Sequence, residues 1–432
     1  MNLQNYIILT VLHADRVFVL LVHQVNCELD MNNKIDNIYK KIETIKNDLL
    51  KLSHDIHSNP EIKWEEFLAV ENILKLLNKY NVQANIIKDI PTAFTASIKG
   101  NSDGPVVAFL AEYDALPDIG HACGHNLIAI TNVGAFLSFL ALNGNFPGEV
   151  RLIGTPAEEA DGGKITLLEK NIFNDIDISL SSHGSSHETI FWDNIPMGEG
   201  MSLAEFPIVY EFHGKSSHAA VSPEKGLNAL NAVLHLFSGI DSIRQHVTDD
   251  VRIHGIITEG GKAPNIVPDF CAADFLIRSK SSSYLEDLRG KINNIAQGAA
   301  LMTGTELKII TTDIGYKDVI PNTTIASIGK NLISEMDIIL DPQPPNKYGS
   351  GGGTDFGNVS HVMPSYAFNF AVSETPVIGH SPDMEKASIS DLAHKNSICV
   401  TKAMASTALL LMEDESIYSK VQTEYKKRMK LV

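Results

Sequence analysis

The sequence predicts an α/β protein: a main domain built on a mostly parallel sheet, interrupted by a smaller ferredoxin-like α+β domain. Two continuous apolar runs flank a buried helical segment, which predicts parallel strands, and later elements follow the order β-α-β-β-α-β. We expect an N-terminal extension at 1–30, the main domain at 31–205 and 314–432, and the inserted domain at 206–313.

The main domain is expected to begin with two helices. Isoleucine and leucine recur mostly at spacings of three and four over 34–57, which predicts an amphipathic helix that ends at Asn59-Pro60. A second helix is expected near 65–80, and weak strand signals follow it up to Ile98.

A parallel β-α-β unit follows. Val106–Ala111 and Val150–Gly154 have the continuous apolar composition of strands buried on both faces, and Leu127–Leu142 between them has that of a buried helix. Such folds place their chemistry just beyond the carboxyl ends of the strands. Segments 112–125 and 155–163 are therefore expected to carry a site.

The order of predicted helices and strands changes in the inserted domain. Its expected elements are a strand at 208–212, a helix at 226–246, strands at 251–258 and 270–278, a helix at 284–302 and a strand at 306–311. The chain then completes the main domain with a helix near 324–336, a glycine-rich loop at 349–353, a strand at 366–371 and a last helix from Ile389.

Composition excludes some classes of partner. The 35 Lys and Arg residues against 52 Asp and Glu residues give a net charge of −17, which repels phosphate backbones, so no nucleic acid partner is expected. Four cysteines in 432 residues are too few for a disulfide framework and favour a reducing compartment or a metal role.

The first thirty residues contain two apolar patches, Tyr6–Leu12 and Val17–Val22. Neither approaches the roughly twenty residues that a membrane span needs, because polar and charged residues separate them. We expect a cytoplasmic protein without a membrane partner. A weak secretion signal within 1–30 is the alternative.

Two clusters of polar residues follow the predicted strands. Cys123 and His125 lie on a glycine-containing turn and offer a thiolate and an imidazole to an ion such as Zn²⁺, although a packed thiol beside a surface histidine is equally compatible. Glu158 and Glu159 end the next strand. Adjacent carboxylates are unfavourable there unless a cation or different tasks separate them, and a solvated acidic turn is the alternative.

Two later histidines could close such a site. His183 follows the apolar run 176–180, and His380 lies in a Gly-His-Ser-Pro sequence. His187 and His361 are the rival candidates on position alone.

A series of motifs together resembles a known family of enzymes. In chain order they are AEYDALPDIGHACGHN, TPAEEADGGK, HGKSSHAAVSPEKGLNAL, PNIVPDFCAADFLIR, GGGTDFGNVSHVMP and GHSP. The chain resembles the aminoacylase and carboxypeptidase class of co-catalytic metallopeptidases. Within that class it is most similar to the amidohydrolase branch that contains p-aminobenzoyl-glutamate hydrolase and the β-alanyl-lysine dipeptidase. The resemblance runs in order from about residue 34 to the C-terminus.

The resemblance implies a role for each matching residue. One or two divalent ions, Zn²⁺ or alternatively Mn²⁺ or Co²⁺, are implied. Glu158 matches the general base that takes a proton from the attacking water, and Asp114 matches a carboxylate that orients a metal-binding side chain. Glu112 stands where other members of the superfamily carry a metal-binding histidine, which leaves the ion count open. The implied metal ligands are Cys123, His125, Glu159, His183 and His380.

The inserted domain matches a lid that also forms a homodimer. His218 corresponds to a histidine that reaches the scissile carbonyl, in many relatives from the partner subunit. Asn265 and Arg278 correspond to residues that hold a terminal carboxylate or carbonyl, and Gly351 and Gly352 lie in the loop that offers backbone N–H groups to it.

The implied activity is metal-dependent hydrolysis of the amide bond of a small dipeptide or N-acyl amino acid with a free carboxylate, above all a dipeptide of the β-alanyl-lysine type. An aminoacylase for fatty- or aryl-acyl amino acids is one alternative. A catalytically silent relative that binds a ligand or scaffolds a partner is the other.

Overall fold

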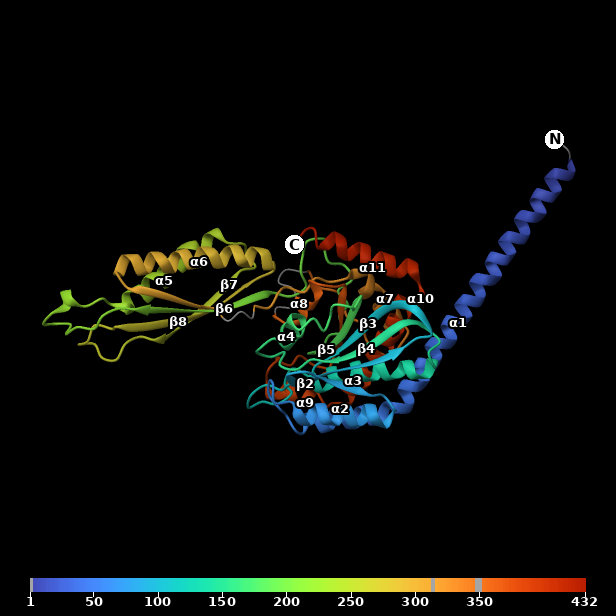
Figure 1. Ribbon diagram of the computed structural model, residues 1–432, viewed down its shortest axis with the longest axis horizontal. Helices are drawn as coiled ribbons and strands as arrows, with labels where there is room; N and C mark the ends of the chain where they lie inside the picture. The colour runs from blue at the N-terminus through green and yellow to red at the C-terminus, as the bar shows by residue number, and fades with distance from the viewer. Residues whose placement is uncertain (1–2, 312–314, 346–351) are drawn as a thin grey trace.

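The computed structural model describes residues 3–311, 315–345 and 352–432, with side chains from Leu29 onward. The chain forms a main domain around a six-stranded sheet and an elongated inserted domain around a four-stranded sheet (Figure 1). Each domain has its own apolar core. This arrangement confirms the predicted fold class.

The main sheet has the order β1-β2-β4-β3-β5-β10. β3 pairs in parallel with β4 and with β5, and β10 pairs in parallel with β5. β2 is antiparallel to β4 and to β1, so the parallel part is the half that follows the β-α-β pattern. The bounds are β1 (Ala84–Ile87), β2 (Ile90–Lys99), β3 (Ser102–Ala111), β4 (Pro147–Gly154), β5 (Ile178–Ser185) and β10 (Ser365–Ala371).

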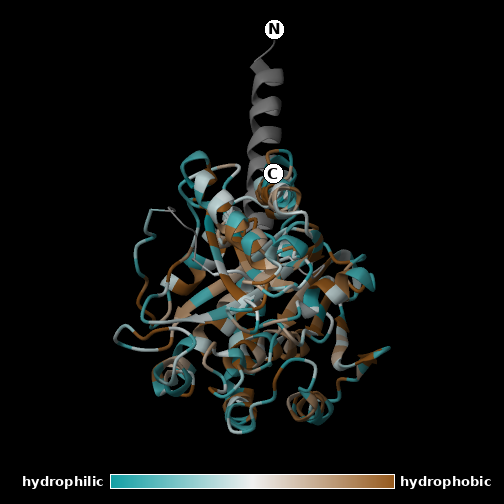
Figure 2. Ribbon diagram, turned by 90° about the vertical axis from the view of Figure 1, so that its left-hand side faces the viewer, coloured by the Kyte–Doolittle hydropathy of each residue, from teal (hydrophilic) through white to brown (hydrophobic). Residues whose placement is uncertain are grey.

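Helices cover this sheet, and helices at the rim of Figure 2 carry both hydrophobic and hydrophilic positions, as amphipathic helices on a core do. The bounds are α1 (Leu3–His57), α2 (Phe67–Lys79), α3 (His125–Ser138) with η1 (Phe139–Leu142), α4 (Gly163–Glu169), α7 (Thr323–Ser334), α8 (Phe356–Ser360), α9 (Pro382–Ala387), α10 (Asp391–Glu413) and α11 (Glu415–Arg428).

Helix α3 is the central helix and contacts α1, α10 and strands β3 and β5. Every residue of α3 is buried. At Gly134 a Cβ atom would lie 2.7 Å from Leu49 of α1 and 2.9 Å from Thr401 of α10, so a glycine is needed where the three helices meet. In the part of the chain with described side chains, His125–Leu142 is the one segment long and apolar enough to span a membrane, and 89% of it is buried in the fold, as in a core helix.

Helix α1 begins earlier than the pattern predicts. The apolar periodicity predicts a start at residue 34, whereas the helix begins at Leu3 and includes most of the expected N-terminal extension. Residues 3–33 contain neither glycine nor proline, so no residue there interrupts a helix.

The inserted domain has the predicted β-α-β-β-α-β order, with the sheet order β7-β8-β6-β9 and antiparallel pairing throughout. Its strands begin at Ala204 and end at Thr311. Ala204 pairs with Ser279 at the end near the main domain, and His213 pairs with Phe270 at the far end. The bounds are β6 (Ala204–His213), α5 (Ala229–Ile243), β7 (Arg252–Glu259), β8 (Phe270–Ser279), α6 (Ser282–Thr303) and β9 (Glu306–Thr311).

Candidate metal centre

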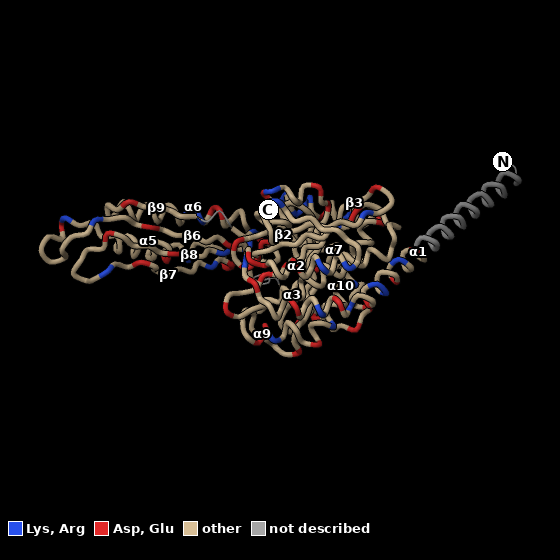
Figure 3. Tube along the Cα trace, turned by 60° about the horizontal axis from the view of Figure 1, so that its bottom comes forward, with Lys and Arg blue, Asp and Glu red and all other residues tan. Residues whose placement is uncertain are grey.

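The predicted metal-site residues meet at one edge of the main sheet. β3, β4 and β5 are parallel neighbours, so their carboxyl ends point to the same edge, the usual place for chemistry in such sheets. Acidic and basic positions crowd together where the two domains meet (Figure 3). The contributing residues are Glu112 and Asp114 after β3, Cys123 and His125 around the start of α3, Glu158 and Glu159 after β4, His183 in β5 and His380 before α9.

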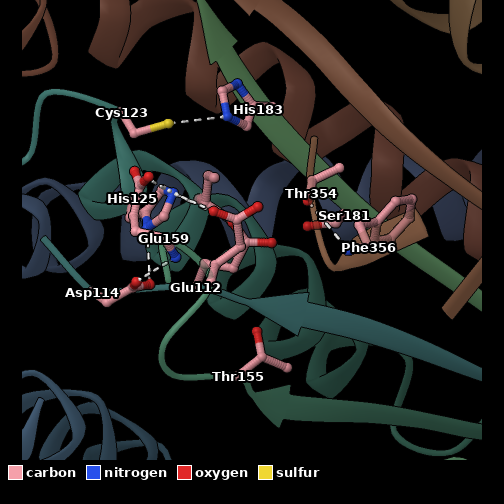
Figure 4. Close-up of polar contacts among 12 residues, drawn as sticks. Glu112, Asp114, Cys123, His125, Thr155, Glu159, Ser181, His183, Thr354 and Phe356 are labelled. Atoms are coloured by element: carbon pink, nitrogen blue, oxygen red, sulfur yellow. Dashed lines mark hydrogen bonds and ion pairs between the residues drawn. The ribbon is translucent and has the colours of Figure 1, made fainter. Parts of the chain in front are cut away.

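The structure brings all five predicted metal ligands together. Donor atoms of Cys123, His125 and His183 all lie within 4.8 Å of one another, and the same holds for Cys123, Glu159 and His380. Cys123 Sγ lies 3.4 Å from His183 Nε2, and the two side chains point toward each other (Figure 4). His380 Nε2 lies 3.7 Å from Glu159 Oε2.

Neighbouring acceptors determine which imidazole nitrogen faces the cluster. His125 Nδ1 lies 3.0 Å from Asp114 Oδ1, and His183 Nδ1 donates to the Gly184 carbonyl at 2.8 Å. With Nδ1 so engaged, Nε2 of each ring is left as the ligand atom, the arrangement typical of metal-bound histidines. Burial lowers the pKa of His183, which favours the neutral ring that a ligand must have.

Asp114 holds two of the ligands at once. Its Oδ1 atom is the partner of His125, and its Oδ2 atom accepts a hydrogen bond from the Glu159 backbone N–H at 3.0 Å. Burial disfavours the Asp114 carboxylate, but the charge and hydrogen bond of His125 outweigh it, so the pKa of Asp114 is lowered. Asp114 is therefore in a position to orient both side chains.

The donor set fits a divalent cation. His125 Nε2 and Glu159 Oε1 are buried 3.6 Å apart, and neither has a hydrogen-bond partner among the described residues. Burial, together with the charge of Glu159, raises the pKa of the Cys123 thiol. Buried polar atoms without partners are costly in isolation. A bound cation would give these atoms a partner and would favour the thiolate form of Cys123.

Glu158 lies beside the ligands. Its Oε2 atom is 3.8 Å from His125 Nε2, and its backbone carbonyl accepts a hydrogen bond from Tyr316 Oη at 2.7 Å. Burial and the negative charges of Glu112, Asp355 and Glu159 raise the pKa of Glu158 well above its ordinary value. A cation at the ligand cluster would lower that pKa and restore the carboxylate that a general base needs.

A buried lysine, Lys164, offsets the negative charge of the acids beside the ligands. The sequence pattern assigned no role to this residue. Lys164 Nζ lies 2.8 Å from Glu112 Oε1 and 2.5 Å from Asp355 Oδ1, and its side chain has no exposed surface. Burial opposes the ammonium, but the charges of Asp355 and Glu112 outweigh it and raise the pKa of Lys164. The one signal in the sequence was an acid, Glu112, beside the predicted ligands, since a buried acid needs a cation.

The predicted substrate-binding residues separate into two groups. Arg278 lies at the domain junction, where its guanidinium is 3.0 Å from Glu205 Oε2. Gly352 is at the same junction, because its carbonyl accepts a hydrogen bond from the Leu203 N–H at 3.1 Å. Gly351 lies outside the described residues.

His218 and Asn265 lie at the other end of the inserted domain. Ala219 donates to the Asn265 carbonyl at 3.1 Å, beyond the end of β6 where His213 pairs with Phe270. Ten-residue strands are roughly 30 Å long, so neither side chain reaches the metal ligands of its own chain. The N–H groups of Ala220 and Val221 donate to His218 Nδ1, which leaves Nε2 as the donor atom of the neutral ring.

The rival histidines lie elsewhere. His187 is exposed beside Ser186, and His361 Nε2 donates to the Asp318 carbonyl at 3.0 Å. Neither belongs to a group of metal donors among the described residues.

Known proteins share this organisation. Residues 203–301 match the family described as the peptidase dimerisation domain. The chain is 34% identical to Xaa-Arg dipeptidase of Mus musculus, over 90% of this chain and 91% of that protein. The chain belongs to the aminoacylase and carboxypeptidase superfamily of metallopeptidases. As a member of this superfamily, it is a metal-binding hydrolase of peptide or amide bonds.

Two further proteins share this organisation in sequence or in fold. The chain is 27% identical to a subunit of the p-aminobenzoyl-glutamate hydrolase of Escherichia coli, over 89% of this chain and 93% of that protein. A dinuclear metal-binding peptidase of Bacillus subtilis shares the fold, with a TM-score of 0.66 and 18% identity, over 86% of this chain and 99% of that chain.

Proposed function

We propose that this protein is a dipeptidase that hydrolyses dipeptides with a free carboxylate and a basic C-terminal residue, as in Xaa-Arg or β-alanyl-lysine. The observation that carries the proposal is the cluster of Cys, His and Glu donors with Glu158 beside it. The similarity to Xaa-Arg dipeptidases of two mammals, at 34% and 32% identity, supports the basic residue.

The chemistry follows from where each side chain lies. A divalent ion at the cluster would lower the pKa of water to about 7 and polarise the scissile carbonyl. Glu158 accepts the proton of the attacking water and returns it to the leaving amine. Asp114 holds His125 and Glu159 in place throughout. Arg278 binds the substrate's carboxylate, because its planar guanidinium can engage both oxygens.

Sulfur, nitrogen and oxygen donors in one cluster suit Zn²⁺, the ion we propose, with Mn²⁺ and Co²⁺ as substitutes. A reducing, cytoplasmic setting is consistent with the free thiols of Cys123, Cys271 and Cys399.

We also propose that the protein works as a homodimer, in which His218 and Asn265 complete the partner's site. His218 Nε2 would donate to the oxyanion that forms during hydrolysis. β7 is an edge strand of the described sheet that carries Ile256 and Ile257, whose surfaces are 65% and 42% exposed. An unpaired apolar edge of this kind favours pairing with a second copy. The description of residues 203–301 as a dimerisation domain supports this.

Mixing two inactive variants tests the shared site. Glu158→Gln lacks the base and His218→Ala lacks the donor, so each homodimer should be nearly inactive. A mixed dimer has one site with both groups, so subunit exchange should restore roughly a quarter of the wild-type rate. Hydrolysis that stays at the level of the separate variants, although mass spectrometry detects mixed dimers, would show that His218 does not act across subunits.

A substrate panel separates the proposal from its alternatives. The metal-loaded protein should hydrolyse Xaa-Arg and β-alanyl-lysine with a higher kcat/KM than acetyl-, fatty-acyl- or benzoyl-amino acids. A preference for the acyl-amino acids would instead make it an aminoacylase. The presence of every predicted ligand and of Glu158 argues against a silent scaffold.

A further inference from the structure

An ion pair stands at the junction between the domains. Glu205 of β6 and Arg278 of β8 are direct cross-strand partners, and the Arg278 guanidinium lies 3.0 Å from Glu205 Oε2. The two side chains are only 18% and 25% exposed. Among the described residues Glu205 Oε2 has no aligned hydrogen bond, so this oxygen keeps capacity for another donor.

The glycine-rich loop closes one side of this pair. At Gly353 a Cβ atom would lie 2.6 Å from the Glu205 carboxylate, so the loop passes directly against this side chain. Two residues later Asp355 contacts Lys164, which in turn contacts Glu112 beside the metal ligands. The same loop thus contacts the Glu205 carboxylate at Gly353 and the lysine beside the candidate metal centre at Asp355.

A second connection leads from Glu205 to the base. The Glu205 N–H donates to the Tyr316 carbonyl at 2.8 Å, and the Tyr316 N–H donates back at 3.0 Å. Tyr316 Oη then donates to the Glu158 carbonyl at 2.7 Å. Tyr316 therefore joins the strand that carries Glu205 to the segment that carries Glu158, and we expect a substrate whose amide lies at Glu158 to extend its C-terminal residue toward this acid and arginine.

We propose that Glu205 selects the basic side chain of the substrate's C-terminal residue, receiving its guanidinium or ammonium while Arg278 turns to the α-carboxylate. This inference rests on the proposed dipeptidase function and assigns the group that reads the substrate. One ion pair within the protein is exchanged for two between protein and substrate, so each charge keeps a partner.

The exchange also explains how neutral residues are rejected. A dipeptide with a neutral C-terminal side chain takes Arg278 for its carboxylate and leaves the poorly exposed Glu205 carboxylate without a cation. Burial already raises the pKa of Glu205 against the opposing charge of Arg278. A site that leaves a charge unpaired discriminates by about 10²-fold or more.

Arginine and citrulline form a matched pair of C-terminal residues, because they have nearly the same shape and differ in charge. Wild-type protein should show a kcat/KM for Xaa-Arg about 10²-fold above that for Xaa-citrulline. Glu205→Gln should bring this ratio close to one. The ratio cancels any effect common to both substrates, so a merely structural role of Glu205 would leave it unchanged.

Glu211→Gln is the control, because Glu211 lies six residues along β6 on the same face of the strand, at the far end of the inserted domain. It should keep the wild-type ratio. If the Glu205→Gln variant does not fold, the Glu205→Asp variant tests the same assignment. It withdraws the carboxylate by one methylene and should lower kcat/KM for Xaa-Lys more than for Xaa-Arg, because the guanidinium reaches farther. Equal losses for both would refute the assignment.

Other outcomes separate this inference from the function beneath it. A Glu205→Gln variant that keeps the preference for arginine would overturn the role of Glu205 and leave the proposed function intact. Wild-type protein that hydrolyses both dipeptides equally would overturn the role of Glu205 and the preference for a basic residue, and would leave only the dipeptidase activity. A metal-loaded wild type that hydrolyses neither dipeptide would overturn both.

Discussion

Replacement of Glu158 by Gln is expected to lower kcat by roughly 10³-fold while the bound metal is retained. The amide has the size of the carboxylate but cannot accept a proton from water. Glu158 has its Oε2 atom 3.8 Å from His125 Nε2, and with Glu112 and His125 it forms a further group of donors. We assign it as the base rather than as a ligand, so its loss should leave KM and metal content nearly unchanged. Steady-state kinetics and metal analysis on the same preparation check this.

Glu66→Gln is a useful comparison for Glu158→Gln. Glu66 is also buried near this site, and its Oε1 accepts a hydrogen bond from the Ala157 N–H at 2.9 Å. Among the described residues, no hydrogen bond or ion pair joins Glu66 to a predicted ligand. Its replacement should reduce kcat far less. A Glu158→Gln variant with an undiminished rate and full metal content would remove Glu158 from the mechanism.

Lys164→Met is expected to lower the free energy of unfolding by about 3–5 kcal/mol, because it leaves Glu112 and Asp355 buried without their cation. Methionine has a similar length, so lost charge rather than lost volume accounts for the effect. Denaturant unfolding of the metal-loaded protein measures it. Addition of Glu112→Gln and Asp355→Asn to the same chain should recover much of the loss.

Lys63→Met provides the matched surface substitution. Lys63 lies 2.8 Å from Asp161, but both side chains are more than a third exposed, so the loss should stay below about 1 kcal/mol. Equal effects of Lys63→Met and Lys164→Met would show that the buried ion pairs do not stabilise the fold.

Much of the fold could be predicted because local sequence patterns indicate most of its helices and strands. The apolar runs at β3 and β4 predicted a parallel sheet, and the order of elements after residue 206 predicted the ferredoxin-like domain. The ends of those strands then indicated where Cys123, His125 and Glu159 would meet. Sequence position alone could not choose His183 and His380 over their rivals, because that choice depends on β5 lying beside β3 and on the turn before α9.

The residues that were missed act through contacts distant in sequence. Lys164 and Asp355 are 191 positions apart, and Tyr316 meets the Glu158 carbonyl from 158 positions away. No local spacing predicts such pairs. The separation of His218 from Arg278 was equally hidden, since it follows from the antiparallel register of β6 and β8.

The central claim is that bound metal at the cluster of Cys123, His125, Glu159, His183 and His380 makes this chain a dipeptidase. The most direct test measures the hydrolysis of an Xaa-Arg dipeptide against the number of divalent ions bound per chain, from metal-free to saturated protein. We predict no turnover without metal and a rate that rises with occupancy to a plateau. Turnover by the metal-free protein, or saturation with Zn²⁺, Mn²⁺ and Co²⁺ in turn without any turnover, would contradict the claim.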